Sequence, residues 1–200
     1  MQGKVGSLAR VLDRFKLTGF VRSGRYAFGR HIPVLAYHRI YNIDDEQEFP
    51  FDVELVSAST AEFQWQMRHL REHYNPIAFA ELLHGMGSGG RLPARPVIVT
   101  FDDGFEDNYR LAFPILRECA VPATFFLATG YIGKKGTFWF DEVAYLVGKA
   151  ECGKLRLGSV NLTVELDATR DSRKQGVRLL LRRFKEVPNV QRLAGLEELR

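Results

Sequence analysis

The chain has 200 residues, of which 46% are hydrophobic and 26% charged, a composition that supports an ordinary buried core and excludes a wholly disordered protein. No apolar run approaches the roughly 18 residues that span a bilayer, and the N-terminus lacks the apolar centre of a signal peptide. We therefore expect a cytoplasmic or membrane-peripheral location. Cys119 and Cys152 are too few for a disulfide framework and are expected to be buried, reduced thiols.

The N-terminal segment, residues 1–31, is strongly basic, with seven Lys and Arg side chains against one acid. Leu8, Val11, Leu12 and Phe15 repeat at helical spacing, which predicts an amphipathic helix. The favoured interpretation packs its apolar stripe on the same domain and leaves the basic face in water. The alternative places the basic helix on an anionic membrane surface. Nucleic acid is not predicted as a partner, because the aromatic residues do not alternate with the basic ones as a stacking surface requires.

A second part, residues 32–148, alternates short apolar runs with helical patterns, which is typical of a parallel sheet covered by helices. One helix is expected to open with a capping box, Ser59 to Glu62. Pro114 falls inside the pattern of a later helix, so that helix either kinks there or restarts with Pro114 in its first turn. We expect strands at 32–38, 97–101 and 123–128, and helices at 59–74, 77–83 and 107–119.

The third part, residues 149–200, has a different pattern. Apolar and polar residues alternate on both sides of Gly158-Ser159, which predicts a half-exposed β-hairpin. Two amphipathic helices follow, and Pro188 ends the first. We interpret this part as an insertion that packs beside the sheet.

The strand expected at 97–101 runs directly into Asp102, Asp103 and Gly104. In parallel α/β folds, ligands and catalytic groups gather at the carboxyl ends of strands. Adjacent carboxylates ionise together only where a cation, hydrogen-bond donors or water separate their charges, and successive side chains leaving a strand point in opposite directions. The pair can therefore divide two chemical tasks, with Gly104 permitting the turn. Asp-Asp-Gly is also the pattern of an ordinary surface turn.

The chain from Val34 to Val147 resembles the polysaccharide deacetylases of the NodB-homology class, carbohydrate esterase family four. The matching stretches are "LAYHRI", "VIVTFDDGFEDNY", "LAFPILRECAVPATFFLATGYIG" and "FWFDEV", in the order in which that family has them. The resemblance implies an α/β fold, here the first half of a distorted (β/α) barrel with a β-hairpin plus helical insertion. It also implies metal-dependent hydrolysis of N-acetyl groups on an N-acetylated glycan. Asp102 would be the general base and Asp103 a ligand of a divalent metal, zinc by expectation.

The sequence departs from this family in its histidines. The family's other metal ligands lie in a His-Ser/Thr-x-x-His motif after the Asp-Asp-Gly turn, whereas all five histidines of this chain precede Asp102. Because catalytic zinc usually has three protein ligands, Asp103 alone is not expected to hold it. We expect a truncation before the histidine motif and a fragment that is inactive alone. The alternative is a non-catalytic module that binds an anionic surface or partner, with Asp102 and Asp103 shaping a turn.

Three of the histidines need separate interpretation. His69 and His73 in "HLREH" have the spacing of a zinc pair, but they lie beside the apolar face of their helix, which favours a solvated pair. That face is expected to carry Phe63, Met67, Leu70 and Tyr74. His38 ends its own strand. It is equally consistent with a position at the barrel mouth near Asp103 and with a hydrogen-bonded core histidine.

Overall fold

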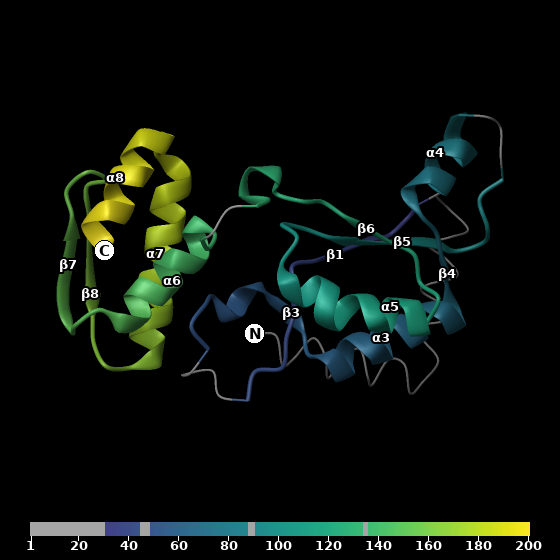
Figure 1. Ribbon diagram of the computed structural model, residues 1–200, viewed down its shortest axis with the longest axis horizontal. Helices are drawn as coiled ribbons and strands as arrows, with labels where there is room; N and C mark the ends of the chain where they lie inside the picture. Colours follow the sequence, from purple (N-terminus) through teal and green to yellow (C-terminus); the bar gives the residue numbers. More distant parts are fainter. Residues whose placement is uncertain (1–30, 45–48, 88–90, 134–135) are drawn as a thin grey trace.

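A computed structural model describes residues 31–44, 49–87, 91–133 and 136–200. These residues form two packed parts that lie side by side, each with its own buried apolar cluster (Figure 1). Apart from His31, the basic segment predicted for residues 1–31 lies outside the described residues, so its helix and its membrane contact stay predictions. No helix in the described ranges is long and apolar enough to cross a membrane.

The first part is built on a parallel sheet whose central strand is β5. Strand β1 pairs along one edge of β5, with Tyr37 opposite Phe101. The other edge receives β4 near the start of β5 and β6 at its end, because the carbonyls of Val97 and Phe101 accept from Ile77 and Phe126. The four strands are β1 (Val34–Tyr37), β4 (Asn75–Pro76), β5 (Pro96–Phe101) and β6 (Ala123–Phe125).

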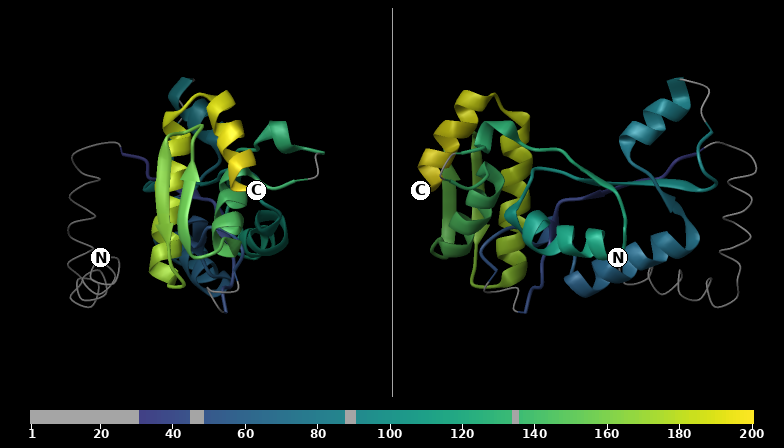
Figure 2. Two further views of the ribbon diagram at one scale, coloured as in Figure 1. Left: turned by 90° about the vertical axis from the view of Figure 1, so that its left-hand side faces the viewer. Right: turned by 45° about the vertical axis from the view of Figure 1, so that its right-hand side comes forward.

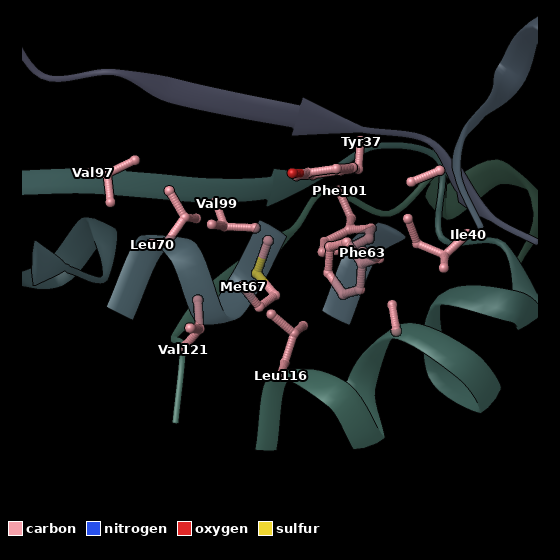
Figure 3. Close-up of a cluster of buried hydrophobic side chains, with 12 residues drawn as sticks. Tyr37, Ile40, Phe63, Met67, Leu70, Val97, Val99, Phe101, Leu116 and Val121 are labelled. Atoms are coloured by element: carbon pink, nitrogen blue, oxygen red, sulfur yellow. The ribbon is translucent and has the colours of Figure 1, made fainter. Parts of the chain in front are cut away.

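Two helices cover one face of this sheet, α3 (Thr60–His73) and α5 (Phe113–Glu118). Alternate β5 residues, Val97, Val99 and Phe101, point into the layer between sheet and helices, as Figure 3 shows. There they meet Phe63, Met67 and Leu70 of α3 and Leu116 of α5. The predicted apolar face of α3 is confirmed, and so is its capping box between Ser59 and Glu62.

The remaining elements of the first part connect this core. A second, two-stranded parallel sheet pairs Arg39 with Val56 and Ile40 with Ala58. The connecting elements are β2 (Arg39–Ile40), the 3-10 turn η1 (Val53–Leu55), β3 (Val56–Ala58), α4 (Phe79–Gly87), the π-helical turn η2 (Asn108–Ala112) and the 3-10 turn η3 (Thr129–Tyr131).

Some boundaries differ from the sequence predictions for physical reasons. The strand expected at 32–38 ends at Tyr37, because the chain then pairs with β3 in a second sheet. The helix expected at 107–119 begins as the π-turn η2 and restarts as α5 with Pro114 in its first turn, the second of the two alternatives. The strand expected at 123–128 ends at Phe125, and Phe126 and Leu127 are exposed.

The second part consists of a hairpin packed against three helices. Its ribbons can be followed in Figure 2. The predicted hairpin is confirmed, with Leu157 paired to Leu162. Its core holds Leu180 and Phe184 of the helix that follows the hairpin, together with Val143 and Val147 of the helix that precedes it. The elements are α6 (Trp139–Lys149), β7 (Gly153–Leu157), β8 (Leu162–Leu166), α7 (Arg170–Glu186) and α8 (Asn189–Leu199).

The predicted α/β class is confirmed. The described parallel strands form an open sheet, and their completion into a barrel stays a prediction. The expectation of two buried thiols is wrong for Cys152, which is exposed, while Cys119 is half-buried; both are free.

The α3 layer offers a direct test of the core. Phe63 is fully buried against Tyr37 and Phe101, whereas Trp65 on the same helix is 66% exposed. We expect Phe63→Ala to lower the free energy of unfolding by roughly 3–5 kcal/mol, because it leaves a cavity in a packed core. Trp65→Ala should change it by less than about 1 kcal/mol. Urea unfolding of both variants checks this, and equal losses would contradict the core described above.

Candidate functional site

The candidate site begins where β5 ends. The N–H of Asp102 donates to the Tyr37 carbonyl at 2.9 Å, which prolongs the β1 to β5 pairing by one bond. The chain then turns sharply, since Gly104 N–H donates back to the Asp102 carbonyl at 2.9 Å. Ala128 N–H donates to the Asp103 carbonyl at 3.2 Å and ties the segment after β6 to the turn. Backbone bonds thus hold both carboxylates at the shared carboxyl end of β1, β5 and β6.

Two consecutive residues of this turn are left-handed. Asp103 has φ 70° and Gly104 has φ 80°. The positive φ of Gly104 is a backbone conformation that residues with a β-carbon rarely adopt, so the predicted need for glycine is confirmed. For Asp103 the same conformation costs on the order of 1–2 kcal/mol. Sequence reasoning missed this strain, although Asp tolerates left-handed backbone better than most residues.

A pocket of about 350 Å³ opens beside the turn. Asp103 lines it, and the half-buried Asp102 is not among its lining residues. Side chains from both parts of the fold build its walls, since the 102–107 turn faces the start of α6 across it. Its lining includes charged and aromatic side chains, among them Arg39, Phe51, Asp103, Phe105, Phe138 and Asp141.

Three buried charged residues meet at this pocket: Arg39 and Asp141 line it, and Asp107 lies behind Arg39. Arg39 Nε donates to Asp107 Oδ2 at 2.9 Å, and Arg39 Nη1 lies 3.6 Å from Asp141 Oδ2. The other oxygen of Asp107, Oδ1, accepts from the Ile40 N–H at 3.2 Å. Because the three residues come from β2, the end of the turn and α6, this buried triad links the sheet to the second part of the fold. The sequence analysis identified none of them as a site residue.

Aromatic rings enclose the guanidinium of Arg39. Its Cζ lies 4.6 Å from the ring centroid of Phe105 and 5.1 Å from that of Phe51. Phe105 in turn packs edge-to-face on Phe138, with centroids 5.0 Å apart. Cation–π contacts of this kind strengthen when water is excluded, so the rings and the carboxylates together fix Arg39 in place.

Burial is the main cause of the pKa shifts of three carboxyl groups at the site. It raises the pKa of Asp141 to about 6, although Arg39 opposes the shift. Burial also raises the pKa of Asp107, more than Arg39 lowers it. The pKa of Asp103 is raised chiefly by partial burial, with His38 opposing and Asp102 adding to the effect. Of the two interpretations of His38, this electrostatic proximity supports the position near Asp103.

The pair predicted to be solvated, His69 and His73, lies on the flank of α3. Their ring centroids are 4.5 Å apart, and the His73 side chain is 42% exposed. The His69 ring also stacks on Trp65 at 5.5 Å. The flank is therefore half-buried, which is less exposed than the sequence indicated.

The described residues do not fit a catalytic zinc ion on their own. Zinc usually takes three protein ligands from His, Cys, Asp or Glu, and no group of three such side chains stands together within the described ranges. Asp103 lines the pocket and offers one ligand, and His38 is near enough to influence the pKa of Asp103.

Residues 89–170 match the sequence model of the family described as polysaccharide deacetylase, a stretch that includes Asp102, Asp103, Asp107 and Asp141. This part of the chain is similar to the polysaccharide deacetylase family. The resemblance predicted from the motifs is thereby confirmed.

Individual relatives match parts of the chain. The poly-beta-1,6-N-acetyl-D-glucosamine N-deacetylase of Staphylococcus aureus MSSA476 is 29% identical over 117 residues, which are 55% of this chain and 40% of that protein. The deacetylase of the same name from Escherichia coli K12 is 34% identical over 84 residues, 42% of this chain and 12% of that protein. The matches thus span two fifths or less of these relatives' lengths. Among solved structures, IcaB from Ammonifex degensii is 23% identical with a TM-score of 0.45, covering 78% of this chain and 71% of that chain.

The raised pKa of Asp141 gives a prediction on stability. An Asp with a pKa of about 6 when folded and near 4 when unfolded binds extra protons in the folded state between these values, so stability falls as pH rises from about 4 to about 6. Asp141→Asn should therefore raise the free energy of unfolding at pH 8, by about 3 kcal/mol at most, and flatten its pH dependence.

Urea unfolding between pH 4 and pH 8, in EDTA to keep metal away, measures this effect. Glu142→Gln on the same helix is the control, because Glu142 pairs with Arg200 outside the pocket. If Asp141→Asn were less stable than the unchanged protein at pH 8, the prediction would be wrong. The contacts of the ionised Asp141 carboxylate would then outweigh the cost of burying its charge.

Proposed function

We propose that this protein hydrolyses the N-acetyl groups of an N-acetylated amino-sugar polymer. The observation that carries the proposal is the position of the Asp102–Asp103 turn, which lies inside the family match and opens on a pocket with aromatic walls. Aromatic faces such as Phe51, Phe105 and Phe138 suit the apolar faces of sugar rings. The names of the relatives support a polymer of β-1,6-linked N-acetylglucosamine as the substrate class.

In this reaction a water molecule attacks the amide carbonyl, acetate leaves, and the amino group stays on the sugar with a proton. Asp102 is the proposed general base that takes the proton from the attacking water. Its backbone is fixed by the bond from its N–H to Tyr37, and its side chain is half-buried beside the pocket. A base that is already in position needs little reorganisation before it takes the proton from water.

Asp103 is the proposed metal ligand. Its carboxylate lies at the pocket wall on a strained, left-handed residue, and strained backbone gathers at functional sites. A divalent cation, zinc in the simplest case, would polarise the amide and acidify water when bound. The other ligands would have to come from residues outside the described ranges, because these hold no group of three.

A different observation, the incomplete ligand set of the described residues, favours a second candidate, a module that binds a glycan or an anionic partner without catalysis. With one carboxylate at the pocket wall and no complete ligand set in the described ranges, binding alone needs no metal. Metal content and acetate release separate the two candidates.

The roles of the two carboxylates are tested in the product of the complete gene. With a β-1,6-linked N-acetylglucosamine tetramer as substrate, Asp102→Asn should leave metal content unchanged and slow acetate release by roughly 100-fold or more, as expected for losing a positioned base. Asp103→Asn should abolish stoichiometric metal binding, because a neutral amide replaces an anionic ligand.

Glu118→Gln is the matched control, since Glu118 pairs with Arg68 on the surface away from the pocket. Metal is measured by elemental analysis and acetate by a coupled assay. Loss of metal in Asp102→Asn with retention in Asp103→Asn would reverse the two roles. Absence of acetate release from the unchanged protein in the presence of zinc would favour the binding module.

A further inference from the structure

The inner wall of the pocket contains a buried donor and a buried acceptor whose hydrogen bonds are not formed. Arg39 and Asp141 are 8% and 4% exposed, and both line the pocket. Arg39 Nη1 and Asp141 Oδ1 have no hydrogen-bond partner among the described residues. The distance of 3.6 Å between Arg39 Nη1 and Asp141 Oδ2 is too long for a hydrogen bond. Leaving such groups unpaired costs free energy, so each calls for a partner.

Contacts on its Nε edge and with two rings hold Arg39 in this orientation. Asp107 holds its Nε edge at 2.9 Å, and Phe105 and Phe51 lie over its guanidinium at 4.6 and 5.1 Å. Nη1 faces Asp141, whose Oδ2 lies 3.6 Å away. Asp141 stands near the start of α6, which the second part of the fold holds through the neighbouring Val143.

We propose that Arg39 and Asp141 form a specificity site that binds a ring hydroxyl of the amino-sugar substrate. Both atoms are closed off from solvent, so a hydroxyl reaches them by separating the loose 3.6 Å contact between Arg39 Nη1 and Asp141 Oδ2. Because a hydroxyl is both donor and acceptor, it then satisfies both groups by accepting from Arg39 Nη1 and donating to Asp141 Oδ1. A site built to hydrogen-bond a substrate hydroxyl rejects analogues that lack it, because its own buried groups then stay unpaired. The inference rests on the proposed function and adds the residues that select the sugar.

The surrounding residues agree with this assignment. Phe51, Phe105 and Phe138 supply apolar walls, and Asp103 stands on the same pocket. A sugar whose hydroxyl reaches the inner wall can therefore keep another substituent at Asp103. Charge also fits, since Arg39 faces both Asp107 and Asp141, and hydrogen bonds from a hydroxyl to charged groups are among the stronger ones.

The test is a binding cycle that uses the complete gene product carrying Asp102→Asn, so that the ligand is not consumed. The ligands are the β-1,6-linked N-acetylglucosamine tetramer and its 3-deoxy and 4-deoxy forms, because the C3 and C4 hydroxyls are free in that polymer. Calorimetric titration should show that one deoxy tetramer binds at least about tenfold more weakly than the parent. Adding Asp141→Asn should weaken binding of the parent by a similar factor and leave binding of that deoxy tetramer unchanged.

Two further comparisons make the outcome decisive. Arg39→Lys keeps the charge but removes Nη1, and it should show the same selective loss; Glu142→Gln should show none. Equal weakening of all three ligands by Asp141→Asn, or no weakening, would overturn the specificity site. If the unchanged protein still released acetate, the proposed function would stand and only the specificity site would be overturned. Failure of the unchanged protein to bind or hydrolyse any tetramer would overturn both.

Discussion

The buried charge of Arg39 is the constraint on which the rest of the site depends. A cation in a water-poor position must be paired, and Arg39 is paired with Asp107 on the far end of the Asp-Asp-Gly turn and approached by Asp141 from α6. One guanidinium thereby ties the sheet, the turn and the second part of the fold to one another. Phe105, which follows Gly104, packs on the same guanidinium, so the position of the turn and the position of Arg39 are set together.

This arrangement holds a turn that is not intrinsically favourable. Asp103 adopts a left-handed backbone, and Asp141 is buried although its pairing with Arg39 is loose. Both features lower stability, and both stand on the one pocket beside the two carboxylates. A structure selected for stability alone would place a glycine at 103 and an apolar or amide side chain at 141. Such local violations of otherwise consistent packing are typical of functional sites.

The sequence was a good guide to elements whose signals are local. The capping box at Ser59, the apolar face of α3 and the hairpin around Gly158 were predicted because each depends on residues close in the chain. The motif around Asp102 and Asp103 likewise indicated the turn and the family resemblance. Arg39, Asp107 and Asp141 could not be predicted, because they lie 68 and 34 residues apart, and only the sheet topology and the packing of α6 bring them together. The conformation of Asp103 was missed because no residue pattern demands it.

A double-mutant cycle between Arg39 and Asp107 tests most directly whether this buried pair holds the site together. Free energies of unfolding would be measured for Arg39→Met, Asp107→Asn and the double variant. If the pair is the buried support described above, Arg39→Met strands the carboxylate of Asp107 and costs roughly 3–5 kcal/mol, while the double variant, which removes that stranded charge, costs clearly less than Arg39→Met alone. Single losses that are small and simply additive would contradict it, because they would show that neither charge depends on the other.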